Sequence, residues 1–566
     1  MESEFRPVLD PVGQSAGLSA LAAATPLLLL FVLLGAVRMK AHRAALAALA
    51  CALVVAAAGF GMPVLTAANS ALAGAAFGLF PIMWIVVNAI WIYNMTVQTG
   101  HFEVLRRSIC SVSPDLRVQA VVIAFCFGGL LEALAGFGTP VAISAAMLIA
   151  LGLAPMKAAA AALVANTAPV AFGAMAAPIT TLAALTDLSV HEVSSMVGRQ
   201  TPVLAAVVPL VLVLIVDGRR GLRQTWPAAL LVGVVFALAQ FAAANYLSAQ
   251  LTDVVAALAA TGALVLMLRR WRPAEEVAAE SAAGERAAAR AEGAARLAHR
   301  VEAGADGGGP ALRTTPAERR GRAETLRAYA PYLVIIAVFS LAQIGPVKAL
   351  LEQTTTAFPW PGLHVLNADG TPAKSTVFTL DWLASSGTLL LLCGIAVAAI
   401  IGLRPGESLR VYWHTLCRLR TAALTVALVL GLAYLLNLSG QTTAIGHWLA
   451  GAGAAFAFLS PVLGWLGVAV TGSDTSANAL FGSMQATVAA QTGADPLLYA
   501  SANSSGGVIG KMISPQNLAI ATAVTGIDGR EGDLLRKVIG WSLLFLLAMC
   551  LLVVLQAGDV LGWMVP

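Results

Sequence analysis

Long apolar stretches recur along this chain and alternate with short polar segments. Stretches of about 18 residues or more are typical of membrane-spanning helices. Spans are predicted near residues 16–37, 44–66, 80–99, 158–182, 199–216, 224–245, 252–268, 329–350, 381–402, 420–438, 497–524 and 538–556. The alternating pattern of a membrane β-barrel is missing from the sequence. We therefore expect an all-α polytopic membrane protein with about 12 transmembrane helices.

Two further apolar stretches, about 118–154 and about 461–490, are interrupted in the middle by glycine-rich polar segments. The first contains GFGTP at 136–140 and the second contains GSDTS at 472–476. Non-helical backbone at membrane depth is tolerated only against protein or beside a water-filled cavity. We therefore interpret both stretches as re-entrant hairpins, which return to the side from which they entered.

The distribution of basic residues predicts the orientation. With the N-terminus outside, 29 of the 34 Lys and Arg fall in cytoplasmic segments, and five do not: Arg6, Arg199, Lys348, Lys374 and Lys511. This bias follows the positive-inside rule, and it holds only if both hairpins are re-entrant. We expect both termini on the periplasmic or extracellular side and the long 269–328 loop in the cytoplasm, where we interpret it as a linker.

The breaks recur in order, which indicates an internal repeat. Asn166 follows Gly136 by about 30 residues, and Asn503 follows Gly472 by nearly the same distance. An odd number of crossings separates the copies, so the second is inverted, as in secondary transporters. The predicted organisation is a first inverted repeat (16–216), two linking helices (217–268), the 269–328 loop and a second inverted repeat (329–556).

Residues at the breaks are the candidate binding groups. Gly136 and Gly138 interrupt the first hairpin, and the segment from Gly472 to Asp474 interrupts the second. The stretches that begin at Asn166 and at Asn503 are expected to break the helices that follow. Free N–H groups at such half-helix starts suit a small anion, and neighbouring hydroxyls suit a hydroxyl group. The candidate substrate-binding residues are Gly136, Gly138, Thr139, Asn166, Thr167, Ser473, Thr475, Asn503, Ser504 and Ser505.

Three ionisable residues lie inside these elements, namely Glu132, Asp474 and Lys511. A charge within a membrane segment is costly, so each is a candidate for proton coupling. Asp474 is our first candidate proton carrier, with Lys511 as its counter-charge, and Glu132 is the second. A purely structural Asp474–Lys511 ion pair is the alternative. Glu132 could also cap the first break.

The composition is typical of a membrane protein and argues against metal, cofactor and nucleic-acid binding. Hydrophobic residues make up 59% and charged residues 11% of the chain, whereas soluble domains carry about 25% charged residues. The six cysteines are scattered with no CxxC, so we expect no metal and no cofactor. The basic residues follow the membrane, so we expect no nucleic-acid partner. The partners are a small solute, a proton and lipid, and a homodimer is left open.

Several segments resemble the bacterial lactate permease family: EALAGFGTPVAI, NTAPVAFGAM, FLSPVLGWLGVAVTGSDTSANALF and NSSGGVIGKMISPQNLAIA. The resemblance extends over nearly the whole chain. It implies a proton-coupled symporter of L-lactate and related 2-hydroxy monocarboxylates, such as D-lactate and glycolate, in the bacterial inner membrane. It also implies kinship with the ion transporter superfamily. The family usually has EGAAGFG where this chain has Ala133 and Leu134 after the glutamate.

Three other functions compete with this interpretation. A sodium-coupled or other small organic anion transporter would have the same architecture. A membrane-embedded enzyme would need facing carboxylates or a serine with a base, and the seven histidines lie in or beside loops, so we expect no catalytic residues. A channel would need a continuous polar lining, whereas the polarity here is focused at the breaks.

Overall fold

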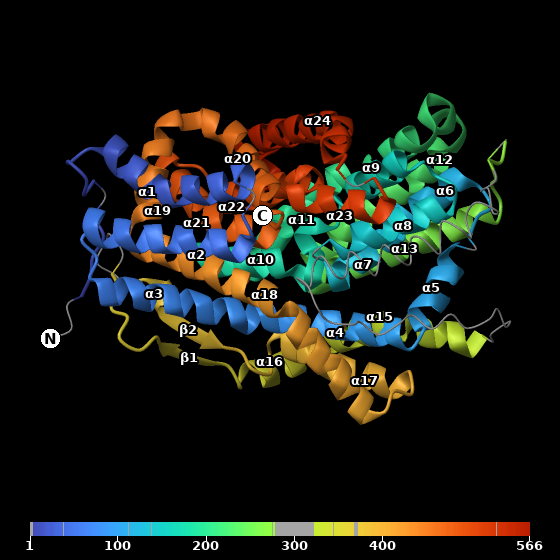
Figure 1. Ribbon diagram of the computed structural model, residues 1–566, viewed down its shortest axis with the longest axis horizontal. Coiled ribbons are helices and arrows are strands. Elements are labelled where there is room, and N and C mark those ends of the chain that lie inside the picture. Colours follow the sequence, from blue (N-terminus) through green and yellow to red (C-terminus); the bar gives the residue numbers. More distant parts are fainter. Residues whose placement is uncertain are drawn as a thin grey trace.

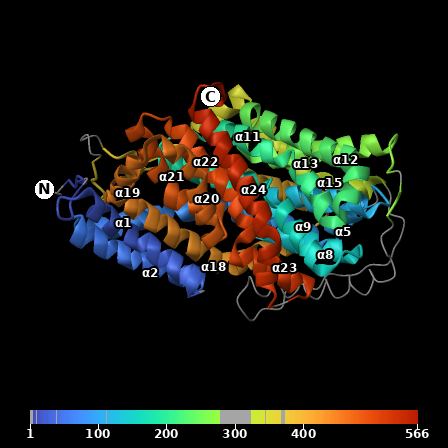
Figure 2. The same ribbon diagram turned by 90° about the horizontal axis from the view of Figure 1, so that it is seen from above.

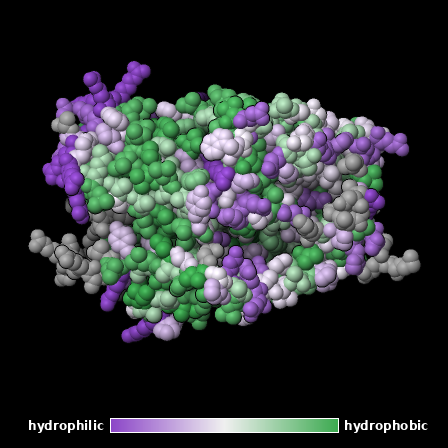
Figure 3. Space-filling model, turned by 180° about the vertical axis from the view of Figure 1, so that it is seen from behind, coloured by the Kyte–Doolittle hydropathy of each residue, from purple (hydrophilic) through white to green (hydrophobic). Residues whose placement is uncertain are grey.

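The computed structural model describes residues 4–8, 10–37, 39–110, 112–136, 138–273, 275–277, 322–342, 344–366, 372–527 and 529–566. Most of the predicted 269–328 loop lies outside these ranges. Within them, nine helices are long and apolar enough to cross a membrane, or up to eleven if each of two bent helix pairs counts as one span. The predicted all-α polytopic class is confirmed. Figure 3 shows the broad hydrophobic area that such a protein presents to lipid.

The helices up to residue 268 make up the predicted first repeat and the two predicted linking helices (Figure 1). They are α1 (Ala16–Phe31), α2 (Ala41–Val54), α3 (Val64–Phe77), α4 (Trp84–Gln98), α5 (His101–Cys110), α6 (Leu116–Ala120), α7 (Gly128–Ala135), α8 (Thr139–Ala150), α9 (Pro155–Ala165), α10 (Gly173–Thr186), α11 (Val190–Ala205), α12 (Val208–Tyr246) and α13 (Thr252–Leu268). Short π-helical segments join several of them: η1 (Val32–Ala36), η2 (Val55–Gly59), η3 (Gly78–Met83) and η4 (Val121–Phe127).

The second part of the chain contains helices and one small antiparallel pair of strands. The strands β1 (Thr356–Pro359) and β2 (Val377–Leu380) pair with Thr356 opposite Leu380. The helices are α15 (Arg322–Ala342), α16 (Gly345–Glu352), α17 (Ser386–Ile400), α18 (Pro405–Leu438), α19 (Gln441–Leu449), α20 (Phe456–Thr471), α21 (Asp474–Thr492), α22 (Pro496–Gly510), α23 (Pro515–Thr525) and α24 (Glu531–Ala557).

Both interrupted stretches form helical hairpins at the predicted positions. In the first, α6, η4 and α7 run from Leu116 to Ala135, and α8 returns after Gly138, which has a left-handed φ of 86°. In the second, α20 ends at Thr471 and α21 begins at Asp474, with Gly472 at φ 75°. Figures 1 and 2 place α8 toward one end of the long axis and α20 and α21 toward the other.

The helix after the first hairpin is broken where the sequence predicts it. α9 ends at Ala165, a turn covers Asn166 to Pro169, and a 3-10 turn, η5 (Val170–Phe172), leads into α10. The pair bends by 64°. The first half of this predicted element is therefore a short helix that ends at Ala165 in buried surroundings.

The predicted break at Asn503 to Gly507 is wrong. α22 continues as a regular helix to Gly510, and the chain leaves it only at the 3-10 turn η9 (Lys511–Ile513). The glycines serve close helix packing, because a Cβ on Gly506 would lie 2.1 Å from the carbonyl oxygen of Pro461 in α20. A Cβ on Gly464 of α20 would lie 1.9 Å from the carbonyl oxygen of Asn503. Each glycine inside a helix costs about 1 kcal/mol of stability relative to alanine. The close approach of α20 and α22 requires glycine at these positions in spite of that cost.

Three predictions about the spans also change. An apolar helix that the sequence analysis did not separate, α3, precedes the predicted 80–99 span, and the chain is kinked at Phe80 (φ −136°) before α4. α18 begins at Pro405 and not at 420, because a helix can continue as a polar helix beyond the apolar stretch. The predicted spans 199–216 and 224–245 meet at Gly218, where a φ of 67° interrupts α12. Hydropathy locates apolar stretches and does not see polar helical extensions.

Candidate functional site

An ion pair joins the two predicted repeats at the centre of the candidate site. Lys511 Nζ of η9 donates to Glu132 Oε1 of α7 at 2.6 Å. The other carboxylate oxygen, Oε2, accepts from Asn166 Nδ2 at 2.8 Å. Glu132 is only 2% exposed and Lys511 only 6%. A carboxylate is therefore held at this point by an ammonium group and an amide, away from bulk water.

Small residues leave the space in which this carboxylate lies. A Cβ added to Gly173, at the start of α10, would lie 2.7 Å from Glu132 Oε1, and one on Gly136 would lie 3.3 Å from the same oxygen. Both positions are breaks in helical structure. The two glycines of the first repeat thus bring backbone up against the carboxylate.

The chain directly after Gly173 is strained. Ala174, Met175 and Ala176 have φ values of 44°, 55° and 61°. A left-handed conformation costs about 1–2 kcal/mol for each residue with a side chain. Such strain persists only where the surroundings fix it, and it clusters at functional sites. The strained residues lie beside Glu132 and Asn166, so they belong to the same candidate site.

Asp474 does not pair with Lys511, so the expected counter-charge is corrected. Asp474 Oδ2 accepts from Ser504 Oγ at 2.6 Å and from Asn478 Nδ2 at 3.4 Å. Its Oδ1 is buried without a hydrogen-bond partner, and a Cβ on Gly507 would lie 2.3 Å from that oxygen. Lys511 lies one turn beyond Gly507 and reaches Glu132 of the other repeat instead.

The second asparagine holds helices together. Asn503 Nδ2 donates to Asn478 Oδ1 at 2.9 Å, and Asn503 Oδ1 accepts from Gln485 Nε2 at 2.7 Å. Asn478 and Gln485 both belong to α21, which makes Asn503 a bridge from α22 to the hairpin. Ser505 turns the other way and donates to Gln200 Oε1 of α11 at 2.7 Å. Asn166 and Asn503, aligned by the repeat, therefore have different environments.

The remaining predicted residues lie at the hairpin tips or beside the first break. Ser473 caps α21 by accepting from the backbone N–H of Ser476 at 3.3 Å. Thr139 and Thr475 are half-buried in the first turns of α8 and α21. Thr167 is buried and donates to the carbonyl oxygen of Val164 at 2.6 Å. The structure brings Glu132, Asn166 and Lys511 into contact and groups Asp474 with Ser504.

Two buried polar residues near this centre were missed by the sequence analysis. Gln240 of α12 donates to the carbonyl oxygen of Ala168 at 3.1 Å and to Asp253 Oδ1 of α13 at 3.2 Å. Asp253 is fully buried. Its signal was present, since it is an acidic residue inside the predicted 252–268 span, but it stands at the edge of that span, where charges are usually solvated.

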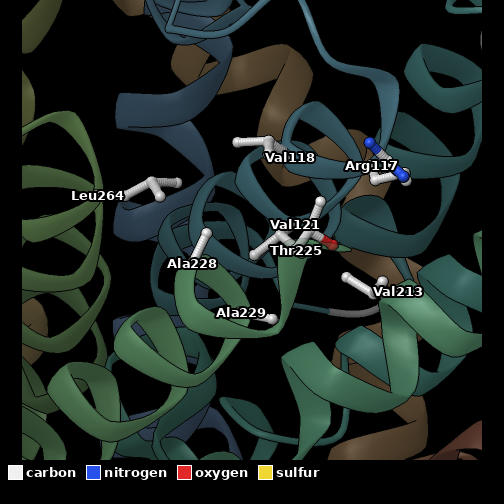
Figure 4. A pocket seen from close by; sticks show the side chains of 8 residues that line it. All are labelled: Arg117, Val118, Val121, Val213, Thr225, Ala228, Ala229 and Leu264. Carbon is white, nitrogen blue, oxygen red and sulfur yellow. The ribbon is translucent and has the colours of Figure 1, made fainter. Parts of the chain in front are cut away.

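A narrow gap without room for a water molecule lies between side chains of α6, η4, α12 and α13 (Figure 4). Its lining is mostly aliphatic, and the guanidinium of Arg117 beside it is already bound by Asp115 at 2.8 Å and Asp217 at 3.3 Å. We assign no ligand to it. Across the described ranges, no group of three or more His, Cys, Asp or Glu side chains could hold a metal ion.

Comparisons with known proteins identify relatives over almost the full length. The L-lactate permease family matches residues 19–558. An L-lactate permease of Bacillus subtilis is 42% identical over 98% of this chain and 99% of its own length. The L-lactate permease of Escherichia coli K12 is 39% identical over 98% of both chains. Glycolate permease GlcA of the same strain is 40% identical over 97% of both.

Among solved structures, the YdaH transporter of Alcanivorax borkumensis aligns over 86% of both chains with 14% identity and a TM-score of 0.42. A similarity of this size carries no argument about the arrangement of the helices.

Proposed function

Because the chain belongs to the L-lactate permease family, we propose that it is a secondary active transporter that carries L-lactate, D-lactate or glycolate together with a proton. We place it in the bacterial inner membrane with both termini periplasmic. Names of relatives support the class of solute. The geometry of the Glu132–Lys511 ion pair supports the proposed coupling ion and binding residues.

The observation that carries the proposal is the way Glu132 is bound. A 2-hydroxy monocarboxylate presents the same carboxylate group, and Lys511 and Asn166 are the donors that such a group requires. We infer that the substrate carboxylate takes the place of Glu132 on these two donors. Thr139, Ser473 and Thr475 at the half-buried hairpin tips are the candidate partners of the 2-hydroxyl group.

Proton coupling follows from the same exchange. Glu132 can leave Lys511 at low cost only if it takes up a proton, since an unpaired buried carboxylate is strongly disfavoured. The substrate anion then neutralises Lys511, and the proton neutralises Glu132. The loaded site carries no net charge, which permits movement through a low-dielectric region. Asp474 is the alternative proton site, since its Oδ1 is buried without a hydrogen-bond partner in the described part of the chain while its Oδ2 accepts from Ser504.

Uptake by purified protein in liposomes tests the function. With an acidic exterior, the protein should accumulate labelled L-lactate, and an uncoupler should abolish accumulation. A panel of monocarboxylates in the same assay defines the substrate range. Accumulation that ignores pH and follows a sodium gradient would transfer the coupling to sodium.

A channel and a membrane-embedded enzyme can be distinguished from a transporter in the same preparation. Saturable flux with counterflow is expected of a transporter and excludes a channel. Chemical conversion of the solute by the purified protein would favour an enzyme. The family names point to transport.

A further inference from the structure

Asp253 and Gln240 form a pair in which two buried oxygens have no donor. Both hydrogens of the Gln240 amide nitrogen are used, one by the carbonyl oxygen of Ala168 and one by Asp253 Oδ1. The Ala168 contact also fixes which end of the amide carries nitrogen. Asp253 Oδ2 and Gln240 Oε1 are then buried acceptors without a partner. They belong to the same two side chains.

One proton on Asp253 accounts for both unpartnered oxygens. A protonated carboxyl group has a hydrogen to donate from Oδ2 to the amide oxygen while its Oδ1 accepts from the amide nitrogen, and the two contacts together would close a cyclic acid–amide pair. The ionised form would instead leave a carboxylate that is fully buried with one hydrogen bond at 3.2 Å and no ion pair. A buried carboxylate in such surroundings takes up a proton.

The charged groups near enough to interact electrostatically with Asp253 are Glu132 of α7 and Lys511 of η9. Lys511 already donates to Glu132 at 2.6 Å. We propose that Asp253 is a second protonation site, and that its ionisation makes it a second competitor for Lys511. The proposal rests on the function argued above, because it concerns the ammonium group that is inferred to hold the substrate carboxylate.

The net charge of Lys511, Glu132 and Asp253 depends on how many protons the two carboxyl groups hold, and this charge affects binding of the substrate anion. With Asp253 and Glu132 both protonated, the three groups carry +1 and attract an anion. With only Asp253 protonated they carry zero, and with both ionised they carry −1 and repel it. Substrate binding should therefore require two protons at alkaline pH. Gln240 is a positioning residue, since it acts by holding Asp253 against the first break.

The test is the pH dependence of equilibrium L-lactate binding to the full-length protein in detergent. One titrating group changes apparent affinity by up to about tenfold per pH unit, and two change it by up to about a hundredfold. We expect the two-proton slope in the wild type and the one-proton slope in Asp253→Asn. The same reduction is expected for Glu132→Gln, and the double variant should be flat. Asp559→Asn, an exposed acidic residue after α24, is the matched control and should behave as the wild type.

Asn at position 253 can donate to Gln240 Oε1 as the protonated acid does, so the variant should fold. Asp253→Glu keeps the carboxyl group and should restore the two-proton slope. An infrared band of a protonated carboxylic acid should disappear in Asp253→Asn and remain in Asp559→Asn. A one-proton slope in the wild type, or a slope and an infrared spectrum that Asp253→Asn leaves unchanged, overturns the proposal. Failure of the wild type to accumulate lactate under an acidic exterior would instead refute the proposed function.

Discussion

Replacement of Glu132 by glutamine distinguishes a functional ion pair from a structural one, because the two roles predict opposite changes in substrate affinity. Glutamine keeps the shape of the side chain and removes the charge that competes for Lys511. If the pair is structural, the variant should only lose stability and bind substrate less well. If the substrate carboxylate displaces Glu132, the variant should bind it more tightly.

The magnitude follows from the contacts that the substrate has to replace. Glu132 accepts from Lys511 at 2.6 Å and from Asn166 at 2.8 Å. A hydrogen bond to a charged group contributes about 1.5–3 kcal/mol, and about 1.4 kcal/mol is tenfold in affinity. Removal of the competitor should therefore tighten L-lactate binding by roughly 10- to 100-fold at alkaline pH. A proton on Glu132 would remove the same competitor in the wild type, so protonation should reduce the difference between the two proteins.

Stability gives a second and independent readout. Without a carboxylate beside it, Lys511 is a buried unpaired charge, which costs about 3–5 kcal/mol. The substrate-free variant should melt earlier than the wild type, and L-lactate should raise its melting temperature by more than it raises that of the wild type. Glu407→Gln, at an exposed position in the first turn of α18, is the matched control.

The assays are equilibrium binding of labelled L-lactate across a pH series, thermal unfolding with and without L-lactate, and transport in liposomes. Counterflow should persist in Glu132→Gln, and accumulation driven by an acidic exterior should be lost. Weaker binding at every pH, together with a melting temperature that L-lactate does not raise, would show that the pair is structural. The exchange of Glu132 for substrate would then be refuted.

Further predictions concern the other polar residues and the helix packing. Asn166→Ala should weaken L-lactate binding by roughly 10- to 100-fold, because it removes one of the two donors proposed for the substrate carboxylate; unchanged binding would remove Asn166 from the site. Asn503→Ala should lower the melting temperature with affinity retained, because its amide joins α22 to α21. Asp474→Asn should keep proton-driven accumulation, and loss of accumulation with counterflow intact would move the proton to Asp474. Gly506→Ala should destabilise the protein by about 1–3 kcal/mol, whereas Gly540→Ala, with open space around its Cβ, should not.

Local signals in the sequence were sufficient to predict the two hairpins. Gly138 and Gly472 adopt left-handed φ values of 86° and 75° that side chains disfavour, so glycine at a hairpin tip is informative without any knowledge of neighbours. The same reasoning failed at Gly506 and Gly507, because glycine also allows two helices to approach closely. Only the position of α20 in the folded structure shows whether such a glycine breaks its own helix or allows a neighbouring helix to pack closely. The composition of the segment is the same in both cases.

The partner of Lys511 could not be predicted from the sequence for a related reason. Glu132 is 379 positions away, whereas Asp474 is nearby in the same repeat. The repeat alignment compares equivalent positions in the two copies and does not indicate which residues of one copy contact the other. Asp253 was overlooked because it stands in the first turn of α13. Its burial results from packing against α7 and α12, which a single sequence does not display.

The ion pair connects the two repeats where both leave regular helical structure. Lys511 stands at the start of the break after α22, and Glu132 lies against Gly173 and Gly136 at the breaks of the first repeat. A movement that separates these breaks has to break the pair, and a ligand can drive such a movement only through different affinities for the two states. A proton on Glu132 and a carboxylate on Lys511 provide that difference together, whereas either alone leaves one buried charge without a partner. Coupling between proton and anion would thus follow from the cost of an unpaired charge, with the strained turn at Ala174 to Ala176 as the backbone element closest to the change.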